Sequence, residues 1–303
     1  MSLFSPAHTA VSGVADPADS PEFWSGTDAG ITFRGVGRSF GPHDVVAGVD
    51  LHVAPGEVIA VLGPSGCGKS TLLRLAAGLD APTTGSIVIG DAAVRSWDRR
   101  CAVAFQEPRL LPWRSLRENV ALGLPRTRRR RSAAEDARVD ELLELVGLAD
   151  FAGYRPRAVS GGMAQRASLA RALARDPYVL LLDEPFGALD ALTRLKMQDL
   201  LLSVHAASPA TILLVTHDVD EALQLADRIV LLGPDADAAA DAAAANRAGT
   251  ADGVVTYREV AARGPAGVRS VHAVPGARPR NRGSADLARI RGELFAALGV
   301  AAH

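Results

Sequence analysis

Short apolar runs that end in polar or turn residues recur along this chain. Val58–Leu62, Tyr178–Leu182 and Thr211–Thr216 consist almost wholly of apolar or β-branched residues, and runs of four to eight such residues are typical of strands that are buried on both faces. Cys101–Phe105 and Asp227–Leu232 have the same character. Because segments with helical periodicity separate these runs, the pattern predicts an α/β fold built on a mainly parallel sheet.

A second pattern, the alternation of apolar and polar residues, occurs before Val58–Leu62. Ile31–Arg34 and Val45–Val53 alternate in this way, as half-buried antiparallel strands do. Phe40-Gly41-Pro42 marks a turn between them. A dense group of turn residues then leads into Ser86–Gly90, which predicts another short strand.

Residues 107 to about 160 have a different character. Prolines punctuate loops there, and Ala134–Val146 has helical periodicity, so we expect a helical insert rather than part of the sheet. The basic run Arg126–Arg131 lies just before that helix. It is either a patch for nucleic acid or lipid or a solvated loop, and the acidic residues of the neighbouring helix favour the loop.

The two ends of the chain and one internal segment differ from the centre in composition. Residues 1–29 are rich in Ala, Ser, Pro and Asp, which predicts a disordered leader. Residues 234–253 form a low-complexity Ala/Asp insert. In the C-terminal extension, residues 254–303, we expect edge strands at Val254–Tyr257 and Val268–Val274 and an amphipathic helix at Leu287–Leu298. The remaining residues, 30–233, form the predicted folded domain, with a helical subdomain at about 107–165.

Composition limits the classes of partner. The chain has 303 residues, of which 48% are hydrophobic and 22% charged, with a net charge of −1, so it is of ordinary globular type and has no global attraction to nucleic acid or anionic lipid. We expect no nucleic-acid partner. The two cysteines form no C-x-x-C pair, which favours a reduced, cytosolic protein. No basic and apolar leader and no run of about 18 apolar residues is present, so any work at a membrane requires another chain to hold this one there.

One glycine-rich stretch carries the strongest chemical signal. Gly63-Pro64-Ser65-Gly66-Cys67-Gly68-Lys69-Ser70-Thr71 lies between the predicted strand Val58–Leu62 and a helical pattern from Leu72. It fits G-x-x-x-x-G-K-[ST], whose glycines let backbone N–H groups approach a polyphosphate at the start of a helix. Lys69 is expected to reach the β- and γ-phosphates, Ser70 to place its hydroxyl on Mg²⁺ and Thr71 to support the helix start. The alternative, a glycine-rich structural turn, is disfavoured by the fixed spacing and the flanking elements.

Polar residues follow three of the predicted strands: Gln106, the pair Asp183-Glu184, and His217. Two carboxylates at the end of a buried strand are costly unless a cation or a proton donor is present. In a magnesium–nucleotide site, Asp183 would help to hold the metal and Glu184 would orient or deprotonate the attacking water. A lone His is usually structural, but a third polar group at a strand end favours contact with the γ-phosphate. Gln106 is either an ordinary polar edge residue or part of this ligand edge.

Two further sites stay open on residue types alone. Ser160 can cap the helical segment that begins at Met163, and with Gly161 and Gly162 it exposes backbone N–H groups at a positive helix end. This is either a second anion site or a plain capped helix. Phe40 is either a core aromatic, which its sequence context favours, or a platform on which an adenine ring stacks.

Taken together, these motifs resemble the ATP-binding subunit of an ABC transporter. The likeness covers roughly residues 31–232 and six motifs in order: the Walker A loop Gly63–Thr71, the Q-loop at Gln106, the signature Ser160-Gly161-Gly162 with Gln165, Walker B at Leu180–Glu184, the D-loop Ala188-Leu189-Asp190, and the switch His217. Phe40 matches the family's adenine-stacking aromatic. The signature departs from the commonest form, because Val159 replaces Leu and Met163-Ala164 precede Gln165.

Less specific features place the chain beside one group of the family. The signature SGGMAQR, the segment Phe105–Arg114 and the tail Arg278–Arg282 are similar to those of the nitrate, sulfonate and taurine importers, and the aliphatic sulfonate import subunit is the most similar of these. The resemblance implies an ATP-hydrolysing subunit that supplies energy for import, with taurine, nitrate or another small solute as alternative cargo. A soluble ABC ATPase acting on nucleic acid is a second alternative, but its long coiled-coil insert or tandem units are missing here.

The resemblance also implies a fold, cofactors and partners. The fold is that of a P-loop NTPase, with a RecA-like parallel sheet core, an antiparallel β subdomain and an α-helical subdomain of ABC type. The cofactors are ATP and Mg²⁺, the latter held by Ser70, Gln106 and Asp183. Two copies would form a head-to-tail homodimer in which Ser160 of each acts on the other's ATP, with Asp190 near the junction. Two transmembrane permease subunits and, indirectly, an extracytoplasmic solute-binding protein complete the assembly, peripheral to the cytoplasmic face of the membrane.

Overall fold

The computed structural model describes residues 29–125, 131–207, 209–234 and 264–299. The predicted leader except Ala29, all but one residue of the arginine run, the Ala/Asp insert except Pro234, and the predicted strand at Val254–Tyr257 lie outside the described residues. The one described member of that run, Arg131, forms an ion pair with Asp136, 2.9 Å apart, on the acidic helix predicted beside it.

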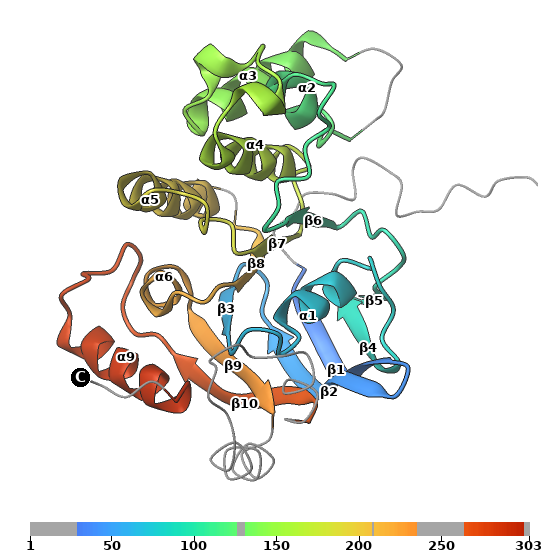
Figure 1. Ribbon diagram of the computed structural model, residues 1–303, viewed down its shortest axis with the longest axis vertical. Helices are drawn as coiled ribbons and strands as arrows, with labels where there is room; N and C mark the ends of the chain where they lie inside the picture. The colour runs from blue at the N-terminus through green and yellow to red at the C-terminus, as the bar shows by residue number, and fades with distance from the viewer. Residues whose placement is uncertain (1–28, 126–130, 208, 235–263, 300–303) are drawn as a thin grey trace, which may run out of the picture.

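In Figure 1, one sheet lies below the layer formed by α2 (Leu116–Val120), α3 (Ala133–Leu145) and α4 (Gly161–Leu173). Its ten strands among the described residues lie in the order β5-β4-β1-β2-β10-β9-β3-β8-β7-β6. In chain order they are β1 Ile31–Phe40, β2 His43–Val53, β3 Val58–Leu62, β4 Thr84–Ile89, β5 Ala92–Ala93, β6 Cys101–Ala104, β7 Val179–Asp183, β8 Thr211–Val215, β9 Arg228–Pro234 and β10 Ala266–Ala273. The pairs from β9 through β3, β8 and β7 to β6 are parallel, whereas β1, β2, β4 and β5 pair antiparallel. This is the predicted division into a parallel core and an antiparallel part.

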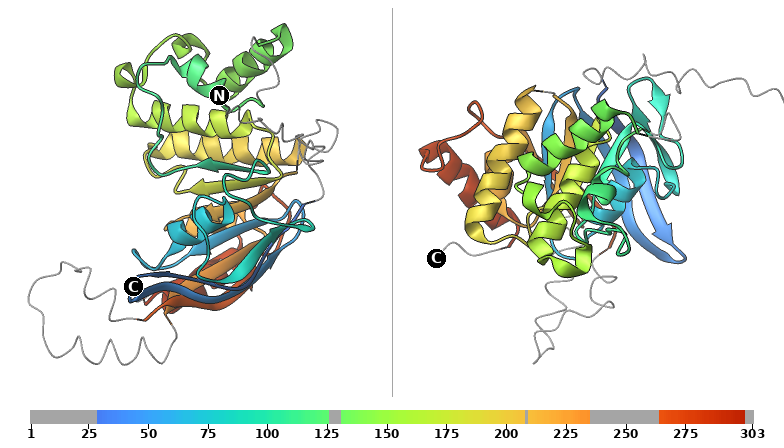
Figure 2. Two further views of the ribbon diagram at one scale, coloured as in Figure 1. Left: turned by 90° about the vertical axis from the view of Figure 1, so that its right-hand side faces the viewer. Right: turned by 90° about the horizontal axis from the view of Figure 1, so that it is seen from above.

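The helices are α1 Lys69–Ala76, α2 Leu116–Val120, α3 Ala133–Leu145, α4 Gly161–Leu173, α5 Ala191–Ala207, α6 Val219–Leu225 and α9 Ala285–Ala297, with short 3₁₀ turns at Ala149–Phe151 and Pro156–Ala158. Figure 2 shows α2, α3 and α4 as an upper layer, with the strands of the sheet below it. The predicted helical insert is therefore confirmed. In both α2 and α3 a Ser caps the helix and a Glu three residues later closes a capping box, which satisfies backbone N–H groups that the first turn leaves without partners.

The central strand β3 explains how the core is divided. Val58, Ala60 and Leu62 belong to the hydrophobic cluster that includes the helical layer. Ile59 and Val61 belong to the cluster that includes β1, β2 and α1. Because successive side chains of a strand point to opposite faces, a continuous apolar run buries both faces of the sheet, as its composition predicts.

The prediction of an edge strand at Val268–Val274 was wrong. β10 lies inside the sheet, antiparallel to β9, and its first residue Ala266 pairs with Val46 of β2. Its side chains alternate between more and less exposed positions. Alternation reports that one face of a strand meets solvent, and it carries no information about which strands lie on either side.

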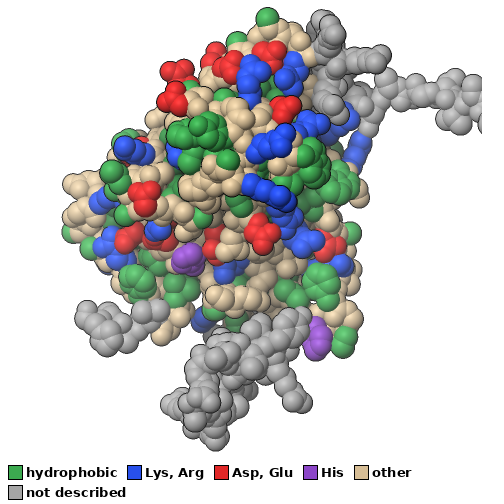
Figure 3. All heavy atoms as spheres, turned by 45° about the horizontal axis from the view of Figure 1, so that its top comes forward, with side chains coloured by type: hydrophobic (Ala, Val, Ile, Leu, Met, Phe, Trp, Pro, Cys, Tyr) green, Lys and Arg blue, Asp and Glu red, His purple; other side chains and the backbone are tan. Residues whose placement is uncertain are grey.

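Among the described residues, no helix is both long enough and apolar enough to cross a bilayer. Acidic and basic side chains are interspersed over the face drawn in Figure 3.

Candidate nucleotide-binding site

The glycine-rich loop connects β3 to α1, as predicted, and close packing explains two of its glycines. A Cβ atom at Gly63 would lie 2.2 Å from the carbonyl oxygen of Leu232, closer than such atoms approach in proteins. Gly68, the N-cap of α1, has a φ of +95°, and a Cβ atom there would lie 2.7 Å from Cγ2 of Val46. Both glycines are needed for the loop to fit against the neighbouring strands. This requirement holds whether or not a ligand is bound.

Lys69 is the first residue of α1, three residues earlier than the apolar pattern suggested. Its Nζ atom donates hydrogen bonds of 2.8 Å to the carbonyl oxygens of Gly63 and Pro64. The ammonium group is thus held within the loop by hydrogen bonds to two neutral carbonyls. A polyphosphate in the loop would offer it anionic partners, which form stronger hydrogen bonds.

Cys67 is buried inside this loop, with its Sγ atom 3.6 Å from the carbonyl oxygen of Leu232. Burial raises the pKa of the Cys67 thiol, and the nearby charge of Lys69 only partly offsets this effect. The thiol therefore packs as a small apolar group rather than as a reactive thiolate.

Ser70 and Asp183 bring two oxygen groups together. The Ser70 hydroxyl donates a hydrogen bond of 3.1 Å to Oδ1 of Asp183, which ends β7. Burial raises the pKa of Asp183, while the hydrogen bond from Ser70 opposes the shift. A buried carboxylate beside a hydroxyl is the kind of oxygen donor set that Mg²⁺ prefers.

Three polar side chains from three strand ends converge beside this pair. Oε2 of Glu184 accepts a hydrogen bond of 3.0 Å from Nε2 of Gln106 and lies 3.3 Å from Nδ1 of His217. These residues follow β6, β7 and β8, which are parallel neighbours. Glu184 has a φ of +45°, a conformation that non-glycine residues adopt at a cost and that is common at functional sites. The side chain of His217 is 67% exposed, so it faces outward over Glu184.

Phe40 is not a core residue. It ends β1, is 47% exposed, and the Arg38 guanidinium carbon lies 4.5 Å from the centre of its ring. Its exposure is compatible with a ring that stacks on a base. Adenine stacking at Phe40 stays a prediction.

The signature residues begin α4. Ser160 is the N-cap, and its hydroxyl accepts a hydrogen bond of 3.3 Å from the backbone N–H of Met163. Ser160 and Gly161 are exposed, and a Cβ atom at Gly161 would meet nothing within 4 Å. A partner surface can therefore approach this helix end closely, as the head-to-tail dimer requires.

Gln165, predicted as part of the signature that acts on the ATP of a second subunit, is buried within its own chain. It is only 2% exposed, and its Nε2 atom donates a hydrogen bond of 2.9 Å to the carbonyl oxygen of Phe105, directly before Gln106. In this arrangement its side chain bonds within its own chain, and its action on the ATP of a second subunit stays a prediction. The reason for its burial lies in helical geometry: Gln165 is five residues beyond the exposed cap, on the face of α4 that packs inward.

Asp190 lies in the exposed turn before α5. Its Oδ1 atom accepts a hydrogen bond of 3.0 Å from the backbone N–H of Thr193, and the side-chain hydrogen bond with Thr193 lowers the pKa of Asp190. This part of the D-loop is thus a charged, capped helix start. Its contact with a second subunit stays a prediction.

Our sequence reasoning missed one group of residues near His217. Asp218 caps α6 by accepting hydrogen bonds from the backbone N–H groups of Asp220 and Glu221. Arg194 of α5 donates to Asp218, and Glu221 is buried beneath. The spacing Asp218-x-x-Glu221 is a helix-start signal that could have located the cap, but no local pattern could have placed Arg194 beside it.

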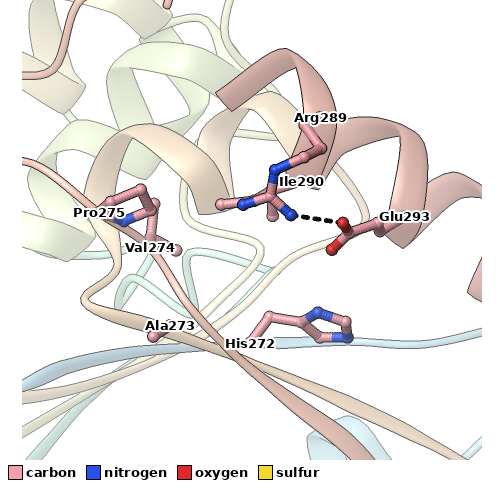
Figure 4. A pocket seen from close by; sticks show the side chains of 7 residues that line it. All are labelled: His272, Ala273, Val274, Pro275, Arg289, Ile290 and Glu293. Carbon is pink, nitrogen blue, oxygen red and sulfur yellow. Dashed lines mark hydrogen bonds and ion pairs between the residues drawn. The ribbon is translucent and has the colours of Figure 1, made fainter. Parts of the chain in front are cut away.

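A pocket of about 360 Å³ lies elsewhere, between β10 and α9. Figure 4 shows His272 on β10 and an ion pair between Arg289 and Glu293 of α9 around it. None of the predicted site residues lines this pocket.

Comparison with known proteins agrees with this geometry. A family model described as ABC transporter matches residues 46–187, and a protein of Mesorhizobium japonicum, "Aliphatic sulfonates import ATP-binding protein SsuB 1", is 46% identical over 88% of this chain and 87% of its own length. This chain belongs to the ATP-binding proteins of ABC transporters. The predicted resemblance and the P-loop α/β fold class are confirmed, and the chain is an ATP-binding, transport-coupled ATPase of that family.

Other relatives of this ABC ATPase carry similar names. "Aliphatic sulfonates import ATP-binding protein SsuB 2" of Frankia alni is 54% identical over 67% of this chain and 76% of its own length, and the protein of the same name from Paracoccus denitrificans is 42% identical over 91% and 94%. Among solved structures, the dimeric ATP-binding cassette MJ0796 in a post-hydrolysis state bound to ADP and Pi has a TM-score of 0.65 and 27% identity, covering 82% of this chain and 100% of that one.

Proposed function

We propose that this ABC ATPase is the energy-coupling subunit of an importer for aliphatic sulfonates. The observation that carries the hydrolytic part is the convergence of Gln106 and His217 on one carboxylate oxygen of Glu184, directly after β7. The cargo is supported by the names of relatives that match most of the chain at 42–46% identity. Taurine and nitrate are the alternative cargoes.

In the proposed reaction each residue has a distinct task. Lys69 exchanges its carbonyl partners for the β- and γ-phosphate oxygens of ATP. Glu184 accepts the proton of the attacking water, and Gln106 and His217 hold the carboxylate that does so. His217 faces outward and can contact the γ-phosphate from that position.

Mg²⁺ fits the oxygen groups at this site. Ser70, Asp183 and Gln106 would hold it, since hydroxyl, carboxylate and amide oxygens are the protein ligands that it accepts. When bound, it neutralises charge that develops on the phosphate oxygens.

We further propose that the working form is a dimer attached to a permease at the cytoplasmic face of the membrane. Ser160 begins a helix in the upper layer, while Lys69 lies at the sheet (Figure 1). The exposed, unobstructed start of α4 suits contact with the ATP of a second copy, and the related cassette MJ0796 has been solved as a dimer. Two permease subunits and an extracytoplasmic solute-binding protein would select the solute.

The dimer is tested with the Glu184→Gln variant, which should bind ATP without consuming it. We expect ATP and Mg²⁺ to convert this variant from monomer to dimer in size-exclusion chromatography with light scattering. Adding Ser160→Arg should abolish the dimer and leave ATP binding unchanged. A protein that stays monomeric with ATP, both alone and with its permease, would refute the dimer.

The cargo is tested by growth. A strain without this gene should fail to grow on an alkanesulfonate as its only sulfur source and should grow on sulfate. The wild-type gene should restore growth, Glu184→Gln should not, and Glu144→Gln, the same change at an exposed position on α3, should behave as wild type. A defect confined to taurine or nitrate would reassign the cargo, and unaffected growth on all three would reject the proposed importer.

A further inference from the structure

Arg194 of α5 connects two segments of the candidate site that are far apart in the sequence. One terminal nitrogen, Nη2, donates a hydrogen bond of 3.3 Å to the carbonyl oxygen of Leu189 in the D-loop. The other, Nη1, lies 3.3 Å from Oδ2 of Asp218, the residue that follows His217. A single planar guanidinium thus spans the D-loop and the segment that carries the switch histidine.

Asp218 is well placed to transmit this contact. Its Oδ1 atom caps α6 by accepting from the backbone N–H groups of Asp220 and Glu221, while its own N–H donates to the Thr216 hydroxyl, 3.0 Å away. The peptide on either side of His217 is therefore fixed by Thr216 and Asp218. A shift of the Asp218 carboxylate toward or away from Arg194 would therefore be expected to move His217 relative to Glu184.

At its other end the arginine reaches a segment that touches the signature. A Cβ atom at Gly162 would lie 3.1 Å from Cδ2 of Leu189, so the first turn of α4 and the D-loop are in close contact. The chain of contacts runs from the signature through Leu189 and Arg194 to Asp218. Its parts come from three elements, α4, α5 and α6.

A buried acid lies against the same arginine. Glu221 is 4% exposed, and the positive charge of Arg194 is among the influences on it. Among the described residues, Oε1 of Glu221 and Nε of Arg194 are both buried without a hydrogen-bond partner. Two unpaired polar atoms on these side chains leave room for a second arrangement of this link, because an unpaired buried polar atom is costly.

We propose that Arg194 is a positioning residue that ties His217 to the D-loop, so that the distance between His217 and Glu184 depends on where the D-loop lies. The inference rests on the proposed roles of Glu184 and His217 in hydrolysis. Contact of a second subunit with the D-loop would then reach the hydrolytic carboxylate within the same chain. Hydrolysis becomes sensitive to dimer formation, while ATP binding at the Walker A loop does not depend on the link.

The test compares five variants for the steady-state kcat of hydrolysis, the Kd of a fluorescent ATP analogue and the melting temperature. Arg194→Ala should lower kcat about tenfold or more, since misplacement of a catalytic group by about 1 Å can have a larger effect, and should leave Kd within about twofold. Arg194→Lys should restore only part of the activity, because an ammonium lacks the two-pronged geometry. Asp218→Asn should lower kcat similarly without loss of stability, since Asn is also a good helix cap.

Arg291→Ala is the matched control. Arg291 of α9 forms an ion pair with Asp220 of α6, so this change also removes an Arg–Asp contact to α6 but leaves the D-loop link intact. Its kcat should equal that of the wild type. The double variant Arg194→Ala/Asp218→Asn should be no slower than the slower single variant, because both changes break one link.

A spectroscopic measurement separates positioning from general loss of structure. In protein labelled with ¹³C in the histidine rings, Arg194→Ala should shift the ring signal of His217, assigned with His217→Gln, and leave the other histidine signals in place. The proposal is overturned if Arg194→Ala retains wild-type kcat, if the two single variants add independently, or if kcat and melting temperature fall together while Kd rises. Wild-type turnover by Glu184→Gln would instead refute the proposed role of Glu184, on which this inference rests.

Discussion

The tail residue Arg280 offers the sharpest test of how the C-terminal part is held to the core. Its side chain is only 3% exposed, and burial lowers the pKa of its guanidinium. The guanidinium donates to the carbonyl oxygens of Pro275, Gly276 and Val274 in the tail and of Leu223 and Gln224 at the end of α6, at 3.1 to 3.3 Å. A cation at the C-terminus of a helix also meets the negative end of its dipole.

The size of the effect follows from these contacts. Two pairs of the carbonyls share one nitrogen each, so Arg280 makes about three independent charged hydrogen bonds. Each contributes about 1.5 kcal/mol, but water can rehydrate part of the exposed carbonyls after truncation, which leaves a loss of about 3 kcal/mol for Arg280→Ala. At about 3 °C per kcal/mol for a chain of this size, the melting temperature should fall by about 9 °C.

Thermal unfolding followed by circular dichroism measures this change. The melting temperature of Arg280→Lys should lie between those of the wild type and Arg280→Ala, because an ammonium has three donors but lacks the planar geometry of a guanidinium. Arg282→Ala is the matched control: Arg282 makes one hydrogen bond of 3.1 Å, to Gln198, and its loss should lower the melting temperature by about 3 °C. If Arg280→Ala melted within about 3 °C of the wild type, the tail would not be fastened to α6 as inferred here.

Three further changes test the site itself. Glu184→Gln should slow phosphate release by about 10²- to 10⁴-fold and keep ATP affinity; wild-type release would reject Glu184 as the base. Burial raises the pKa of Cys67, so its alkylation by a maleimide should be slow at neutral pH and accelerate up to and beyond about pH 9. ATP should block the reaction, which mass spectrometry follows. Fast labelling with ATP present would contradict the placement of this thiol. Burial raises the pKa of Glu221 from 4.5 to about 8, so the folded chain keeps a proton that the unfolded chain loses, and wild-type stability falls as pH rises through this window. Glu221→Gln cannot ionise, so its gain in melting temperature over the wild type should be larger at about pH 9 than at about pH 5; equal differences would refute the shift.

The part of the site that lies at strand ends could be predicted from local patterns. Val58–Leu62 and Tyr178–Leu182 are continuously apolar, so the residues that follow them had to lie at one edge of a parallel sheet. The structure then brings Gln106, Glu184 and His217 within hydrogen-bonding distance. Motif spacing succeeds here because chain connectivity alone places these residues.

Residues whose positions depend on packing between distant elements escaped prediction. Arg194 and Asp218 meet only because α5 and α6 lie beside one another, and Gln165 is buried only because α4 packs on the strand before Gln106. Arg280 is similar, since the resemblance of the tail to a group of importers gave no reason for its arginines. Arg278 and Arg280 both donate to main-chain carbonyls at the end of α6.

The place of β10 inside the sheet has a consequence for how the protein is made. Ala266 pairs with Val46 and the rest of the strand pairs with β9, so a nascent chain on the ribosome lacks an internal strand until Ala266–Ala273 has been synthesised, after all the other strands of the sheet. Until then β2 and β9 each present an open row of N–H and C=O groups, which can recruit strands from other chains. A stalled ribosome or a premature stop codon ahead of Ala266 would therefore release a product prone to aggregation, even though every residue of the nucleotide site had already been translated.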